Sequence, residues 1–173
     1  MCRDPPAAPL LLGAGVRGPA RGDRHDEPFD LERFAAAQER DGSYPRALAE
    51  LRRGRKSTHW MWFVFPQLVG LGHSDTARYY AIGSLEEAAA YLEHPLLGKR
   101  LVECGAIVEA EQRPIEAIFG AVDALKLRSS MTLFLRAAPA GERFQRVLDR
   151  HFAGEADART DTLLAAARSA GTP

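Results

Sequence analysis

Apolar and polar positions repeat at helical spacing along most of the chain. The clearest case is Leu85, Ala88, Ala89 and Leu92, which form a single apolar stripe when residues lie three and four apart. A β-hairpin is indicated by two segments of alternating apolar and polar residues joined by a tight turn, and this pattern does not occur in the sequence. We therefore predict an all-α fold of about eight helices, some of them short, in one compact domain. Helices are expected over residues 31–38, 44–53, 76–82, 97–108, 114–119, 123–137 and 144–152, and around Leu163.

Capping residues mark several of these helix boundaries. Asp30 and Ser43 are predicted N-caps, because a short polar side chain there can accept a hydrogen bond from a free backbone N–H. Ser84 and Glu87 have the spacing of a capping box. Gly120 is expected to end the helix that begins near residue 114, so that a separate helix follows it.

The stretch from Lys56 to Gln67 is the most aromatic part of the chain, with both tryptophans and two of the eight phenylalanines. A helix through it would be apolar on nearly every side, and a strand would also be apolar on both faces. Periodicity alone does not choose between them, but Pro66 ends either one. We predict a short central helix around which the rest of the fold packs.

The composition of the chain favours some classes of protein and argues against others. The chain has 173 residues, of which 46% are hydrophobic and 27% charged, as expected for a soluble globular domain. Its formal net charge of zero argues against a nucleic-acid partner. Cys2 and Cys104 form no spaced pattern, so no disulfide framework or metal site is predicted, and the sequence identifies no cofactor. No apolar run approaches the roughly 18 residues of a membrane span, and we expect a cytoplasmic location.

The first 28 residues differ from the rest of the chain. They hold five of the 11 prolines and four of the 15 glycines. That composition predicts a disordered tail over residues 1–28, followed by a single helical domain over residues 29–173. No function is assigned to the tail.

Four groups of residues resemble a known bacterial family, the domain-of-unknown-function family 1810. They are Asp30–Phe34 with Ala37–Gln38, His59–Gln67 with Gly70–Gly72, Glu87–Ala88 with Tyr91–Leu92 and His94–Pro95, and Leu125–Phe134. The resemblance covers roughly Phe29 to Leu164 and implies an all-helical cytoplasmic domain without assigned catalytic residues. Some members carry the label calpastatin, but nothing in this chain resembles a protease-inhibitor repeat.

The aromatic stretch and its surroundings supply a first set of candidate site residues. His59 could transfer protons near neutral pH, or be a core histidine held by a backbone hydrogen bond. Trp60 and Trp62 could stack a base or sugar, although core packing of at least one of them is the alternative. Gln67 could bind an amide or a hydroxyl, or brace the turn in which it lies. Tyr79 is a further polar candidate.

A second set surrounds Lys126, one of only three lysines among the 23 cationic residues. Asp123, Lys126 and Ser130 share a helix face by their three- and four-residue spacing. The positive charge of a lysine near a helix start is repelled by the positive end of the helix macrodipole. We therefore expect an anion beside Lys126 that offsets this repulsion, either within the protein or on a ligand. Ser129 and Ser130 could donate to that anion, or simply be small residues that allow close packing.

Two functions follow from these candidates. The first is the binding or processing of a small anionic ligand, nucleotide- or sugar-like, with His59 and Lys126 in one site. The second is a non-catalytic protein-interaction module, of unknown partner, whose motifs build the core. There is no glycine-rich phosphate loop and no pattern of a serine hydrolase, so no catalytic residue is predicted. Convergence of the candidates on one cleft would favour the first function.

Overall fold

The computed structural model describes residues 28–138 and 141–170, and within these ranges it is all-helical. The predicted fold class is therefore confirmed. The predicted tail lies outside the described residues, apart from Pro28. The elements are α1 (Glu32–Glu39), the 3-10 helix η1 (Arg40–Gly42), α2 (Ser43–Arg53), α3 (Met61–Val64), α4 (Asp75–Tyr79), α5 (Leu85–Glu93), α6 (Leu97–Ala110), α7 (Ile115–Ala137), α8 (Glu142–Phe152) and α9 (Ala158–Ala170).

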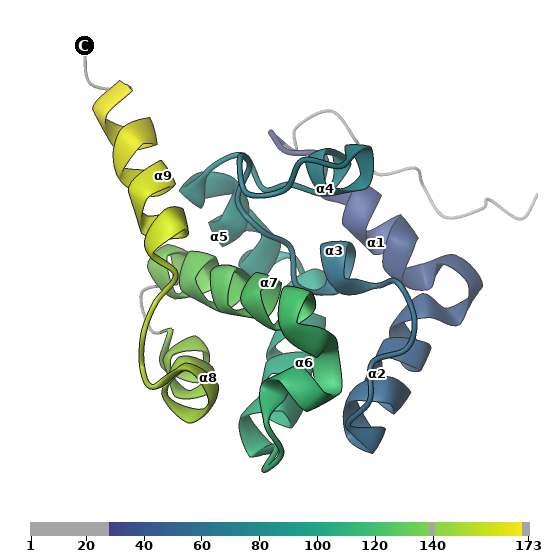
Figure 1. Cartoon of the computed structure of the whole chain (residues 1–173). Coiled ribbons are helices and arrows are strands. Elements are labelled where there is room, and N and C mark those ends of the chain that lie inside the picture. Colours follow the sequence, from purple (N-terminus) through teal and green to yellow (C-terminus); the bar gives the residue numbers. More distant parts are fainter. Residues whose placement is uncertain (1–27, 139–140, 171–173) are drawn as a thin grey trace, which may run out of the picture.

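Helix α7 forms the axis of the molecule (Figure 1). Helices α5, α8 and α9 pack directly against it, and α6 packs against α2, α5 and α8. The short aromatic helix α3 contacts α1 and α6, and α1 and α2 lie on the side of the molecule away from α9. The predicted short helix in the aromatic stretch is thus present, held inside the fold by longer helices.

Aromatic rings join the helices in the core. Phe34 of α1 makes an edge contact with Tyr91 of α5, with ring centroids 5.2 Å apart, and Tyr91 in turn contacts Phe134 of α7 at 5.3 Å. Trp60 packs edge-on against Phe119 at 6.0 Å. These rings are nearly or fully removed from solvent, and such contacts add to the stabilisation from burial alone. Residues from distant parts of the chain therefore share one core.

Helix α7 is interrupted at Gly120, as the sequence predicted. Gly120 has φ 76° and ψ 161°, a conformation essentially restricted to glycine. Just before the break, the carbonyl of Ile118 accepts a hydrogen bond from the backbone N–H of Lys56, at 2.9 Å. The second half of α7 therefore starts beside the loop before α3, with Asp123 and Lys126 in its first two turns.

The predicted caps agree only in part with the structure. The Ser84 hydroxyl accepts from the backbone N–H of Glu87 at 3.1 Å, which confirms the first half of the capping box. The Glu87 carboxylate accepts instead from the N–H of Gly83, at 2.7 Å, and it pairs with Arg33 of α1 at 2.6 Å. The Glu87 carboxylate therefore bonds Gly83 and the partly buried Arg33 in place of the N–H of Ser84.

Two other predicted N-caps are wrong. The residue at the N-cap of α1 is Leu31, and no side chain caps that helix, so Asp30 does not do so. Ser43 is the first residue of α2, and its hydroxyl donates to the carbonyl of Arg40 at 2.7 Å. The 3-10 turn that joins α1 to α2 accounts for this difference, because it leaves no free helix start for Ser43 to cap.

The helix expected over residues 76–82 is shorter than predicted, because α4 ends at Tyr79. Ile82 forms an isolated parallel bridge with Leu68 instead. Its N–H donates to the carbonyl of Gln67 at 2.9 Å, and its carbonyl accepts from the N–H of Val69 at 2.8 Å. This bridge fixes the chain just after the aromatic stretch and so positions the Gln67 side chain.

Candidate functional site

A cleft of about 470 Å³ opens between α3, the loop and short helix that follow it, α7 and the start of α9. One part of its wall is apolar and includes an aromatic ring, and the other part carries cationic, acidic, amide, imidazole and hydroxyl groups. The apolar group includes Trp62, Leu71, Val122 and Leu125, and the polar group includes Gln67, His73, Lys126, Ser129, Asp157 and Arg159.

The loop wall of the cleft depends on a close approach at Gly72. A Cβ atom at this position would lie only 2.5 Å from the Cβ of Ala77 in α4, so a larger residue would push the loop away. Ser74 caps α4, since its hydroxyl accepts from the N–H of Ala77 at 3.1 Å. These two features fold the loop back on α4 and place His73 on the cleft wall.

The α7 wall follows from helical spacing. Val122, Leu125, Lys126 and Ser129 lie three or four residues apart and therefore on one face of the helix. The Ser129 hydroxyl donates to the carbonyl of Leu125 at 3.1 Å, which leaves its oxygen free to accept a hydrogen bond. Val122 and Leu125 are 68% and 64% exposed, so this wall has an apolar rim.

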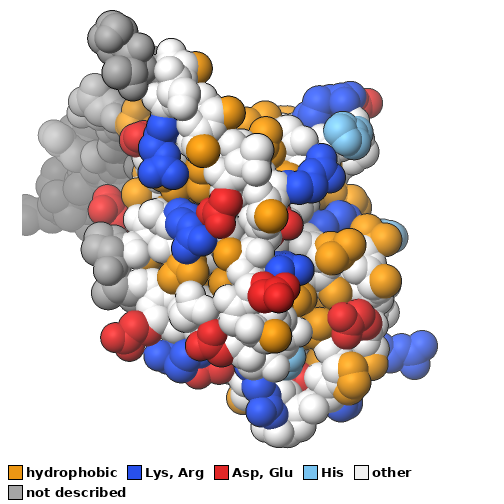
Figure 2. Space-filling view, turned by 60° about the vertical axis from the view of Figure 1, so that its left-hand side comes forward, with side chains coloured by type: hydrophobic (Ala, Val, Ile, Leu, Met, Phe, Trp, Pro, Cys, Tyr) orange, Lys and Arg blue, Asp and Glu red, His pale blue; other side chains and the backbone are white. Residues whose placement is uncertain are grey.

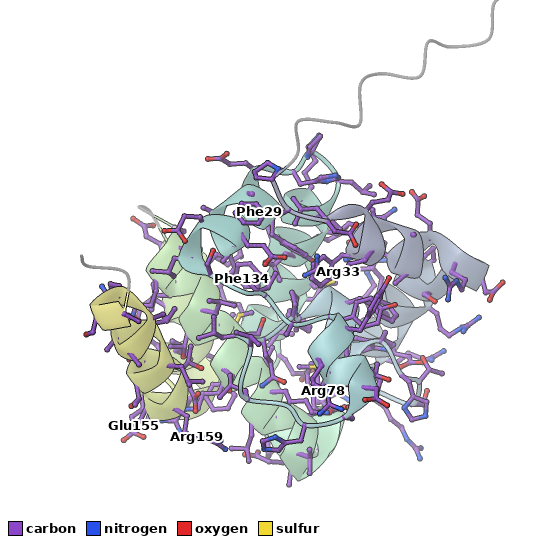
Figure 3. The ribbon with its side chains drawn as sticks, turned by 90° about the horizontal axis from the view of Figure 1, so that it is seen from above. Phe29, Arg33, Arg78, Phe134, Glu155 and Arg159 are labelled. Carbon is purple, nitrogen blue, oxygen red and sulfur yellow. The ribbon has the colours of Figure 1, made fainter. Side chains whose placement is uncertain are left out.

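The start of α9 is fixed by Asp157. Its carboxylate accepts from the N–H of Thr160 at 2.9 Å and from the hydroxyl of Thr160 at 2.6 Å, which caps the helix. The N–H of Asp157 donates to the hydroxyl of Thr132 in α7 at 2.8 Å. Arg159 is thereby held at the cleft, and Figure 3 shows it at the start of α9, near the edge of the molecule.

Behind the cleft, Asp123 joins two lysines. Its carboxylate oxygens lie 2.8 Å from the Nζ of Lys126 and 2.8 Å from the Nζ of Lys56. Each ammonium also lies over a tryptophan ring, Lys126 at 5.0 Å from the centroid of Trp62 and Lys56 at 5.2 Å from that of Trp60. Burial raises the pKa of Asp123, but the hydrogen bonds from the two lysines outweigh it and hold this pKa below its usual range. The anion expected beside Lys126 is thus present inside the protein.

A buried acid, Glu50, holds the loop that carries Lys56. Its carboxylate accepts from the N–H groups of Ser57 and Thr58, at 2.8 and 3.1 Å, and from the Thr58 hydroxyl at 2.7 Å. The indole N–H of Trp60 donates to it as well, at 2.8 Å. Burial raises the pKa of Glu50, but these donors outweigh the effect and lower it to about 2. The charged carboxylate therefore fixes the entry into the aromatic helix.

Four of the candidate residues line the cleft: Trp62, Gln67, Lys126 and Ser129. His59 does not. It is exposed and stacks on Trp62 with ring centroids 6.3 Å apart, while Lys126 lies over the same ring. His59 and Lys126 thus share a contact with Trp62, although only Lys126 lines the cleft.

The other predicted residues lie elsewhere. Trp60 is only 1% exposed and belongs to the core, so the tryptophan at the cleft is Trp62. Ser130 is fully buried, and its hydroxyl has no hydrogen-bond partner within the described part of the chain. Tyr79 is 58% exposed and packs on the ring of Tyr80 at 4.8 Å, away from the cleft. These three residues do not line the cleft.

Sequence reasoning missed several important residues. The sequence could have indicated that Glu50 is buried, because Glu50 lies on the same helix face as the apolar positions Ala47 and Leu51. No sequence pattern pointed to His73 or Arg159, since His73 lies in a loop and Arg159 is one of many arginines. Both became candidates only when their segments met in the cleft.

Three polar groups of the cleft have no internal partner. Among the residues that the structure describes, no hydrogen bond or ion pair engages the side chains of Gln67, His73 or Arg159. An amide, an imidazole and a guanidinium can bind heteroatoms and an anion. Together with the Trp62 ring, they can hold a polar ligand that has a flat or apolar part.

Other kinds of site find no counterpart in residues 28–138 and 141–170. No group of three or more histidine, cysteine, aspartate or glutamate side chains there could hold a metal ion. None of the helices in those ranges is both long and apolar enough to cross a membrane.

Comparison with known proteins identifies the family of the chain and one similar solved structure. The chain is similar to a crystal structure described as the conserved hypothetical protein Rv1873 from Mycobacterium tuberculosis, with 56% identity and a TM-score of 0.78. The match covers 80% of this chain and 99% of that one. No curated protein matches. Residues 28–164 match the family described as protein of unknown function (DUF1810), and the chain belongs to that family.

Proposed function

We propose that the cleft binds, or binds and processes, a small anionic ligand of nucleotide- or sugar-like character. The observation that carries this proposal is the meeting of Trp62, Lys126 and Arg159 in one cleft, with the unpaired amide of Gln67 beside them. Cationic groups attract an anion, the indole provides apolar contact area, and the amide can donate to and accept from a polar ring or hydroxyl. Ligand sites commonly combine a concave, partly apolar wall with a few such polar groups.

The charge balance supports an anion. Among the residues that line the cleft, Lys126 and Arg159 carry two positive charges against one negative charge on Asp157. Asp123 is already shared by Lys56 and Lys126, and Asp157 is engaged by the start of α9. An anionic ligand would therefore meet a site with one uncompensated positive charge.

The distribution of charge favours a small ligand over nucleic acid. The chain has no net charge, and Figure 2 shows cationic and acidic side chains mixed on the face that it presents. A protein that follows a phosphate backbone presents a continuous basic surface, because its affinity comes from many phosphate contacts. The proposed ligand therefore needs no more than one or two phosphate groups.

The alternative is a non-catalytic protein-interaction module. The observation that favours it is the exposed apolar rim formed by Val122 and Leu125. The unpaired amide of Gln67, which is only partly exposed, favours the small ligand, since a partner that covered the rim and excluded water would leave this amide without hydrogen bonds.

A thermal-shift screen with nucleotides and sugar phosphates tests the proposed function. A ligand at 100 times its Kd stabilises the native state by about 2.7 kcal/mol, which raises the melting temperature measurably. We expect Lys126→Met to abolish that shift and to preserve the fold, because Asp123 keeps its ion pair with Lys56.

The matched control is Lys99→Met, because Lys99 is an exposed lysine of α6 outside the cleft. Arg128 is unsuitable as a control, since it donates to the carbonyls of Glu155 and Ala156 and so holds the segment before α9. If no nucleotide or sugar phosphate shifts the melting temperature, or if Lys126→Met keeps the full shift, the interaction module replaces the ligand site.

A further inference from the structure

The cleft does not end at Arg159. A second hollow of about 250 Å³ lies on the other side of this residue, lined by Gly70, Ala158, Thr162 and Leu163 as well as Arg159 itself. Arg159 thus contributes to the walls of both hollows. Arg159, an exposed residue of α9, therefore borders both a larger space beside Trp62 and a smaller one along the first turns of α9.

The second hollow is small and uncharged apart from Arg159. Gly70 has φ +92°, and a Cβ atom there would lie 3.5 Å from the methyl groups of Leu163, so the loop already rests on α9. The Thr162 hydroxyl donates to the carbonyl of Ala158 at 2.8 Å and can still accept a hydrogen bond. These mostly apolar surroundings suit a compact neutral group that has an apolar face and a hydroxyl that can donate to Thr162.

Arg159 differs from the arginines near it. Arg128 pairs with Glu155 at 3.0 Å, and Arg136 pairs with Asp161 at 2.9 Å, and both pairs join α7 to the segment around α9. Arg159 has no partner among the residues that the structure describes. A guanidinium with free N–H groups in a fixed fork matches the oxygens of a phosphate.

We infer that the two hollows bind one ligand in two parts, a nucleoside diphosphate whose terminal phosphate carries a neutral sugar. The nucleoside would occupy the larger cleft beside Trp62, the diphosphate would lie at Arg159, and the sugar would fill the second hollow. This inference rests on the proposed function, because it assigns the ligand class of that same cleft.

Isothermal titration calorimetry on the full chain with ADP and with ADP-glucose tests the inference. ADP-glucose carries less negative charge than ADP, so tighter binding of it cannot come from charge and must come from contacts of the sugar. We expect ADP-glucose to bind about tenfold more tightly, which corresponds to about 1.4 kcal/mol.

Filling the second hollow should remove that preference. In Ala158→Trp, and independently in Thr162→Trp, the ratio of the two dissociation constants should fall to about one. Both residues are exposed on α9, so the core does not have to accommodate the larger side chain. Ala166→Trp is the matched control, because Ala166 is exposed further along the same helix, outside both hollows, and should keep the preference.

Each outcome decides between the two proposals. If the native chain binds ADP and ADP-glucose equally well, the two-part ligand is wrong and the proposed function stands. If the chain binds neither ADP nor ADP-glucose, the two-part ligand is wrong, and the proposed function is wrong for nucleotide ligands. If ADP-glucose binds more tightly but the preference survives in both α9 variants, the sugar lies outside the second hollow and the inference fails.

Discussion

Trp60 and Trp62 show at the residue scale how two neighbours in one motif take different roles. Trp60 is almost fully buried and donates its indole N–H to Glu50, while Trp62 is half-buried at the cleft. We expect Trp60→Ala to lower the free energy of unfolding by roughly 3–5 kcal/mol, as for other buried large aromatics. Trp62→Ala should cost clearly less, and urea denaturation measures both. Equal losses would show that Trp62 belongs to the core as much as Trp60 does.

Glu50 allows a prediction about pH. Its pKa is about 2 in the folded protein, against an ordinary value of 4.5. Because the folded value is the lower one, the stability that Glu50 contributes is fully present above pH 4.5 and is lost as the pH falls towards 2. The difference corresponds to roughly 3 kcal/mol. Urea denaturation between pH 7 and pH 3 should therefore show a decrease in the free energy of unfolding.

The variant Glu50→Gln identifies how much of that decrease belongs to Glu50. An amide cannot accept from all the donors that surround this side chain, so we expect a loss of roughly 2–4 kcal/mol at pH 7. The dependence on pH should also become shallower. Glu116→Gln, at an exposed position of α7, should change neither quantity. A pH dependence in Glu50→Gln as steep as in the native chain would assign the effect to other acids.

The interruption of α7 gives a prediction at the scale of elements. Gly120 and Gly42 both have positive φ and open space where a Cβ would be placed, but their ψ angles differ, 161° against 31°. Residues other than glycine reach the left-handed region of Gly42 at a cost of roughly 1–2 kcal/mol, whereas the Gly120 region is essentially closed to them. Gly120→Ala should therefore lower the melting temperature more than Gly42→Ala does, in a calorimetric comparison. The reverse order would mean that the break can be absorbed by a continuous helix.

The helices also show which of their boundaries could be predicted from nearby residues alone. The helix start at Ser84 was predictable, because its cap is a contact between residues three positions apart. The end of α4 at Tyr79 was not predictable from its own segment. Ile82 leaves the helical pattern to form a bridge with Leu68, and that bridge depends on a residue far away in the sequence.

At the scale of the whole molecule, the cleft consists of segments that are distant in the chain. Gln67 and Lys126 were candidates from the start because each belongs to a distinctive motif, and the structure brings both to the cleft. Arg159 became visible only through its position between the two hollows. The role of Asp123 likewise depends on Lys56, which approaches it from the loop before α3.

The sequence by itself determined the helical class, the end of the aromatic segment before Pro66 and the break at Gly120, because helical periodicity, proline and glycine act within a few residues. Only the tertiary structure decided which tryptophan is buried, which acid pairs with the lysines and which arginine remains unpaired. Those outcomes depend on distances between residues far apart in the chain, and packing of the helices around α7 sets these distances.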